Sequence, residues 1–132
     1  MSFSIEHNGS TLLVSMTGSV DLSESSQIKD NFEKLMSPDI LNVTVDAGNV
    51  EYIDSSGVAS ILFINKICSR SGKGFSIKSI SEAAAKVIRL AKLDSILGVT
   101  EAVIKKSEPV LNKQVSFSEL DAASIFETKN NS

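Results

Sequence analysis

Two serines in the middle of the chain lie in a setting where a modification could act as a switch. The segment from Glu51 to Val58 contains Asp54-Ser55-Ser56-Gly57 and follows a strand-like run, and a run that is apolar nearly all round comes next. Open parallel sheets usually place functional groups at the carboxyl ends of their strands. A phosphate there would add roughly two negative charges at the positive end of a helix. Serine phosphorylation is therefore the chemistry that this segment suggests.

The same residues have a plainer interpretation as the polar cap of a helix. Asp and Ser side chains accept hydrogen bonds from the backbone N–H groups that a helix start leaves free. Gly57 would ease a crowded turn at that point. The segment alone leaves both a helix cap and a modification site open.

Other reactive side chains do not form an enzyme site. His7 is the only histidine, so no Ser/His/Asp or Cys/His arrangement is possible, and no histidine-based metal cluster. Cys68 lies within an apolar run and is expected to pack there. Gly72-Lys73-Gly74 follows a helical run and precedes a strand-like one, which is the reverse of a phosphate-binding loop, and is expected to be a turn. We therefore expect no enzyme activity, no metal and no cofactor.

Hydrophobic spacing predicts an α/β domain that positions the serine segment. Residues 3–6 and 12–16, on either side of His7-Asn8-Gly9-Ser10, predict an N-terminal hairpin. The alternation of strands and helices after it implies parallel pairing, in a mostly parallel central sheet covered by helices. The further expected elements are a helix over residues 23–36 with Ser23 as its N-cap, a strand through Leu41, Val43 and Val45, a helix over 56–69, a strand over 75–79, a helix capped by Ser81, and a last strand or an extended connection over 99–104.

The composition favours protein partners in the cytoplasm. The net charge of −3 gives no basic field for nucleic acid. No run approaches the roughly 18 apolar residues of a membrane-spanning helix, so we expect no membrane insertion, and the N-terminus lacks the pattern of a signal peptide. A single cysteine rules out an intramolecular disulfide and fits a reducing compartment.

The sequence divides into a domain at residues 1–106 and a C-terminal extension at residues 107–132. In the extension, Ser116 and Glu119 have the spacing of a capping box, and Val115 with Leu120 could form a hydrophobic staple. We expect a short helix that ends near Phe126, followed by a disordered end.

Two motifs give the chain a family resemblance. Asp54-Ser55-Ser56-Gly57 resembles the Asp-Ser-[Ser/Thr]-Gly motif of the STAS-domain anti-sigma factor antagonists, and Gly18-Ser19-Val20-Asp21 resembles their Gly-x-hydrophobic-Asp segment. Residues 79–97 resemble the family's strand-to-helix region, and the similarity covers about residues 1–104. The resemblance implies a STAS fold.

The resemblance also implies a site and its partners. In that family the serine after the aspartate is phosphorylated by a cognate anti-sigma factor that acts as a serine kinase, and a phosphatase reverses it. By position the acceptor is Ser55, with Ser56 as the second candidate, and Asp21, Asp54, Ser56 and Gly57 would bind the partner. The implied function is a partner switch that is released by phosphorylation, whose output is transcription or another process such as biofilm formation.

Two alternatives within the same fold remain open. The chain could be a STAS subunit of a lipid or anion transport complex that is not phosphorylated, or a stressosome-type scaffold. The intact Asp54-Ser55-Ser56-Gly57 favours the switch. A nucleotide-binding domain is disfavoured, because the chain has no proper glycine-rich loop and no base.

Overall fold

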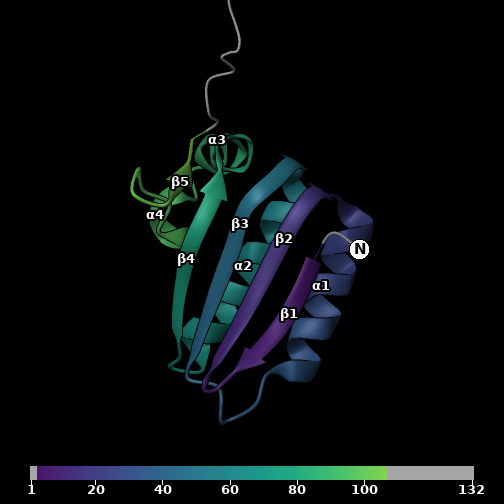
Figure 1. Cartoon of the computed structure of the whole chain (residues 1–132), viewed down its shortest axis with the longest axis vertical. Coiled ribbons are helices and arrows are strands. Elements are labelled where there is room, and N and C mark those ends of the chain that lie inside the picture. The colour runs from purple at the N-terminus through teal and green to yellow at the C-terminus, as the bar shows by residue number, and fades with distance from the viewer. Residues whose placement is uncertain (1–2, 107–132) are drawn as a thin grey trace, which may run out of the picture.

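The structure, a computed structural model, describes residues 3–106 of the 132-residue chain. In this part of the chain five strands form one sheet in the order β1-β2-β3-β4-β5 (Figure 1). The β1–β2 pair is antiparallel and the other three pairs are parallel, which confirms the predicted α/β class with its hairpin and mostly parallel sheet. The elements are β1 (Phe3–Asn8), β2 (Thr11–Val20), α1 (Leu22–Leu35), β3 (Asn42–Ile53), α2 (Ser55–Arg70), β4 (Gly74–Ser81), α3 (Glu82–Leu90), α4 (Asp94–Leu97) and β5 (Ile104–Lys105).

The N-terminal hairpin is longer than its apolar runs predicted. β1 and β2 are joined at Gly9, which has a φ of +63, a left-handed conformation that glycine adopts without steric cost. Along β2 the side chains of Leu12, Val14 and Met16 are buried, whereas those between them are only partly buried. The alternation that predicted the hairpin thus reflects the burial of every second side chain of β2.

The helices cover one face of the sheet only. α1 and α2 lie behind the strands in Figure 1, while α3 and α4 lie at the end of β4 beside β5. Parallel sheets are usually covered on both faces. Here polar side chains suit the uncovered face to water, as where Thr44 Oγ1 and Ser76 Oγ hydrogen-bond at 3.3 Å across β3 and β4. The helices predicted to cover the sheet are therefore present, but they cover only one of its faces.

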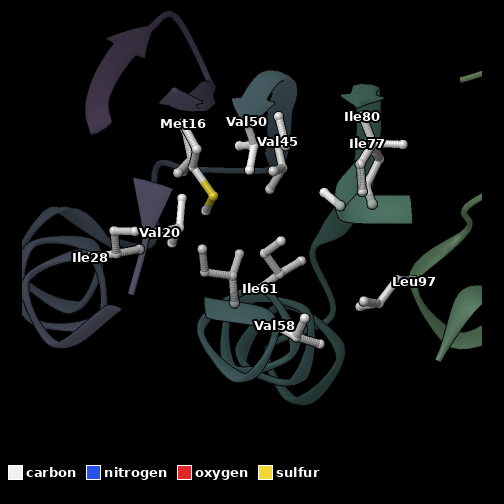
Figure 2. Close-up of a cluster of buried hydrophobic side chains, with 14 of the residues drawn as sticks. Met16, Val20, Ile28, Val45, Val50, Val58, Ile61, Ile77, Ile80 and Leu97 are labelled. Atoms are coloured by element: carbon white, nitrogen blue, oxygen red, sulfur yellow. The ribbon is translucent and has the colours of Figure 1, made fainter. Parts of the chain in front are cut away.

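The core fills the space between the sheet and this helical layer. In Figure 2, Met16 and Val45 of the sheet point toward Ile61 of α2, and Ile28 of α1 and Leu97 of α4 reach the same cluster. None of these five side chains is more than 2% exposed. Full burial of such a side chain contributes about 1.5–3 kcal/mol. Hydrophobic spacing did not predict the short helix α4. Burial of Leu97 in the core holds this helix against the rest of the domain.

Three predicted boundaries were wrong. The N-cap of α1 is Asp21 and not Ser23. β3 does not include Leu41, which is exposed, and it continues to Ile53 instead of ending near Asp46. Between residues 99 and 104 the chain turns, and only Ile104 and Lys105 pair with β4. The predicted extension at 107–132, including its helix at 115–126, lies outside the described residues.

Two expected structural roles are confirmed. Cys68 is fully buried in α2, and burial raises the pKa of its thiol. Gly72, with a φ of +68, forms the turn after α2. Lys73 Nζ donates hydrogen bonds to Ser37 O at 3.2 Å and to Ile40 O, so this turn is tied to the loop before β3.

Candidate functional site

Two aspartates lie side by side where β2 and β3 end. Val20 and Ile53 are paired across these parallel strands, and Asp21 and Asp54 directly follow them. Asp21 is the N-cap of α1 and Asp54 is the N-cap of α2. The Asp54 N–H also makes a long hydrogen bond of 3.5 Å to Val20 O. The two sequence motifs, far apart in the chain, therefore meet at one edge of the sheet.

The Asp54 carboxylate organises the first turn of α2. Its Oδ1 accepts hydrogen bonds from Ser56 Oγ at 2.5 Å, from Ser56 N at 3.0 Å and from Gly57 N at 3.1 Å. The Ser56 hydroxyl first, and then the Gly57 N–H, lower the pKa of Asp54 below its ordinary value, against a smaller opposing effect of burial. Asp54 is therefore held as an anion at the start of the helix.

The two candidate serines have different surroundings. Ser56 is half-buried, and its hydroxyl donates a hydrogen bond to Asp54 Oδ1. Ser55 is exposed, and among residues 3–106 its hydroxyl makes no hydrogen bond. The cap interpretation is correct for Asp54, whose carboxylate accepts from the first free N–H groups of α2 and from the Ser56 hydroxyl. It leaves Ser55 without a role in holding the fold.

Gly57 is needed for close packing. A Cβ at this position would lie 2.5 Å from Ile53 Cγ1 and 2.5 Å from Val20 O. Real Cβ atoms do not approach other heavy atoms so closely, and Val20 O belongs to the backbone. Gly57 therefore lets the start of α2 pack directly on the ends of β2 and β3. Glycine is therefore required at position 57 by this close contact, and not by a crowded turn as the sequence suggested.

Asp21 is held more loosely than Asp54. Its Oδ1 accepts one hydrogen bond, from Glu24 N at 3.2 Å, and its side chain is exposed. Gly18, three residues earlier, has a φ of +65, so glycine is favoured in this segment for conformational reasons. Four of the five predicted site residues are at least partly exposed at the ends of β2 and β3, namely Asp21, Asp54, Ser55 and Ser56. The fifth, Gly57, is buried.

Two exposed apolar residues at this edge were not predicted as site residues. Leu22 is the first residue of α1, and Tyr52 lies near the end of β3. A β-bulge sets the direction of Tyr52: Gly18 pairs with Val50 and Ser19 with Tyr52, which leaves Glu51 without a partner. An alternating pattern could not reveal this, because a bulge breaks the period of two.

A hollow in the surface borders the site but is not part of it. It measures about 790 Å³ and lies between the ends of β2 and β3, the start of α3 and β5. Lys105, which lines it, donates a hydrogen bond to Asn49 Oδ1 at 2.7 Å. None of Asp21, Asp54 or Ser55 lines this hollow.

No group of three or more His, Cys, Asp or Glu side chains among residues 3–106 could hold a metal ion. No helix in that range is long and apolar enough to cross a membrane.

Comparison with known families confirms the fold resemblance. The family model described as "Mlab, STAS domain" matches residues 3–100 of this chain. The chain therefore belongs to the STAS domain family.

Solved structures of known proteins have the same fold. A putative anti-sigma factor antagonist from Thermotoga maritima is 21% identical with a TM-score of 0.64, over 80% of this chain and 86% of that one. The anti-sigma factor antagonist SpoIIAA in its unphosphorylated form is 16% identical with a TM-score of 0.63, over 80% and 88% of the two chains. Its phosphorylated form has also been solved and is similar to this chain.

Another similar structure is of a protein that is named for a different function. A sulfate transporter family protein from Wolinella succinogenes is 12% identical with a TM-score of 0.60, over 72% of this chain and 75% of that one. At these identities all of these likenesses show the fold alone.

Proposed function

We propose that this chain is a phosphorylation-controlled partner-switching regulator of the anti-sigma factor antagonist type. Unphosphorylated, it binds a cognate serine kinase of the anti-sigma type, and phosphorylation of Ser55 releases it until a phosphatase restores the hydroxyl. The chain is the substrate of this reaction and not its catalyst. The observation that carries the proposal is the contrast between the two serines: the Ser55 hydroxyl is exposed and free of hydrogen bonds within residues 3–106, while the Ser56 hydroxyl is donated to Asp54.

The contrast favours Ser55 as the acceptor for a chemical reason. In the transfer, the serine Oγ attacks the γ-phosphorus of ATP in the kinase, its proton passes to a base of the kinase, and ADP leaves. Ser55 can present its Oγ without any loss of contacts. Ser56 would first have to give up its hydrogen bond to Asp54 Oδ1 and leave the cap of α2.

Release after phosphorylation follows from the relative size of two energies. Removing an ion from water into an interface costs several kcal/mol, whereas a solvent-exposed ion pair returns only about 0.2–1 kcal/mol. A phosphate on Ser55 lies next to the Asp54 carboxylate, so the two anions also repel each other. The start of α2 favours the phosphate within the domain itself. We therefore expect the phosphorylated chain to stay folded and to lose its partner.

Mass spectrometry tests the proposal. The full chain is incubated with ATP, Mg²⁺ and each purified serine kinase of the anti-sigma type from the same organism, and the phosphate is located by fragmentation. The proposal predicts one phosphate on Ser55 in the wild type and in Ser56→Ala, and none in Ser55→Ala. Modification of Ser56 alone, or no modification by any of these kinases, would contradict it.

The transport-subunit alternative keeps one observation in its favour. The same fold occurs in the sulfate transporter family protein from Wolinella succinogenes. In such a role the Asp54 and Ser56 cap would be structural and Ser55 would stay unmodified. Stable association of the unmodified chain with a membrane transporter, insensitive to Ser55→Asp, would support it.

A further inference from the structure

Two large apolar side chains stand out from the acidic edge described above. Leu22 is 68% exposed and Tyr52 is 54% exposed. Single exposed apolar residues are common and need no explanation by themselves. These two are distinguished by position, because Leu22 directly follows Asp21, and Tyr52 stands two residues before Asp54. They therefore lie at the same end of the β2–β3 pair as Asp21 and Asp54.

The exposure of Tyr52 is built into the sheet. In a regular strand Tyr52 would point to the same side as Val50, which is buried, and Ile53 would point away from it. The bulge at Glu51 shifts the phase by one residue, so that Ile53 is buried and Tyr52 faces outward. Bulges are rare between parallel strands and are frequent next to functional sites, where they redirect a side chain. The sheet loses a regular pair here, and the outcome is an exposed aromatic ring.

The charges on the two strand ends and helix starts have one sign. Residues 18–24 and 49–57, where β2 and β3 end and α1 and α2 begin, contain aspartate and glutamate but no lysine or arginine. Asp21 and Glu51 are exposed, and Asp54 is partly so. Two lysines lie across the hollow, Lys105 hydrogen-bonded to Asn49 and Lys106 paired with Glu101. A surface that covers this edge must therefore bring positive charge to match it.

We propose that Leu22 and Tyr52 are the anchors by which this edge docks on its serine kinase, in an apolar recess of the kinase bordered by lysine or arginine. The inference rests on the proposed function and deepens it. Anchors of protein interfaces are typically aromatic or large apolar side chains near the centre, with charged groups at the rim. Such a contact brings the kinase to the end of the sheet at which Ser55 begins α2.

Binding measurements on the full chain test the anchors against matched controls. The probe is the purified serine kinase that phosphorylates wild-type Ser55, and the readout is its Kd by isothermal titration calorimetry. Leu22→Ala and Tyr52→Ala should each weaken binding by about tenfold or more. Leu90→Ala and Ile96→Ala remove similarly exposed side chains, 75% and 59%, away from this edge and should change the Kd less than about twofold. Circular dichroism checks that all four variants fold.

A second set of variants tests the charge. Asn caps helices as well as Asp does, so Asp21→Asn keeps the cap and removes only the charge. Asp21→Asn and Glu51→Gln should weaken binding and reduce its dependence on salt. If Leu22→Ala and Tyr52→Ala bind as the controls do, the inference is wrong while the proposed function stands. If no such kinase binds the wild type, the proposed function fails and the inference fails with it.

Discussion

Asp21 and Asp54 hold equivalent positions on two adjacent parallel strands. Each directly follows one member of the Val20–Ile53 pair, and each caps the next helix, with φ and ψ of −103 and −170 at Asp21 and −108 and −174 at Asp54. Two helix starts and two carboxylates therefore share one edge, and Ser55 lies beside the second of them. Neighbouring residues at this edge therefore have different roles: Asp54 caps α2, Ser56 supports that cap, and Ser55 is exposed.

The first prediction concerns the pKa of Asp54. The Ser56 hydroxyl is the largest cause of its lowered pKa, so Ser56→Ala should raise this pKa toward the ordinary value. Ser55→Ala removes a hydroxyl that does not contact Asp54 and should leave the pKa unchanged. NMR titration of the Asp54 side-chain carboxyl carbon measures both. Equal shifts in the two variants would refute the different roles assigned to the serines.

The second prediction is a pH dependence of stability. Because folding lowers the pKa of Asp54 below the ordinary 3.8, its contribution is fully present above about pH 3.8 and is lost as the pH falls through the lowered value. Asp54→Asn keeps the cap but cannot titrate, so its free energy of unfolding should fall less than that of the wild type between pH 7 and pH 2.5. Urea denaturation at several pH values measures this.

Glu101 provides the comparison for that experiment. Hydrogen bonds from Arg89 and then Lys106 lower its pKa from 4.5 to about 2. Its contribution to stability is therefore also lost as the pH falls. Glu101→Gln should remove a separate part of the acid dependence, and this part should be weakened by salt because the group is exposed. If Asp54→Asn has the same acid dependence as the wild type, the cap does not depend on ionisation.

The third prediction concerns Gly57. An added Cβ would meet Ile53 Cγ1 and Val20 O at 2.5 Å, and the backbone would have to move. Gly57→Ala should therefore destabilise the domain by about 1–3 kcal/mol, although alanine favours helices. Ser55→Ala, an exposed change in the same helical turn, is the control and should have little effect. An unchanged thermal unfolding midpoint in Gly57→Ala would show that the contact can relax.

Some of these features could be predicted from the sequence and others could not. The buried residues of β2 and the cap Ser81 of α3, whose Oγ accepts from Ala84 N at 3.1 Å, follow from local patterns. The cap of α1 was misassigned because Asp21 and Ser23 are both good capping residues. The end of β3 was missed because the bulge at Glu51 interrupts the alternation.

The division of labour at the site also needed the structure. The sequence ranked Ser55 above Ser56 only through the family motif, and the structure adds the difference in exposure and the hydrogen bond from Ser56 Oγ to Asp54. Likewise, the pairing of β2 with β3 brings Leu22 and Tyr52 to the same edge, and no local pattern contains that pairing. Hydrophobic periodicity predicts local elements, but it does not predict which strands pair and which residues they bring together.

The fourth prediction concerns charge at Ser55. Ser55→Ala should bind the kinase as the unphosphorylated wild type does. Ser55→Asp should bind about 3- to 10-fold more weakly, since aspartate has less charge than phosphate. Ser55→Asn, which has the size of aspartate without its charge, is the control, and surface plasmon resonance gives the three affinities. Equal weakening by Asn and Asp would mean that size and not charge governs binding at this position.

The most direct test compares the Kd of the kinase for two forms of the full chain, unphosphorylated and stoichiometrically phosphorylated on Ser55. Calorimetry with kinase and ADP avoids further phosphotransfer during the measurement. Our account predicts that the phosphate weakens binding by about 30-fold or more, the equivalent of about 2 kcal/mol, while circular dichroism shows the same fold in both forms. Equal or tighter binding of the phosphorylated form would contradict the switch.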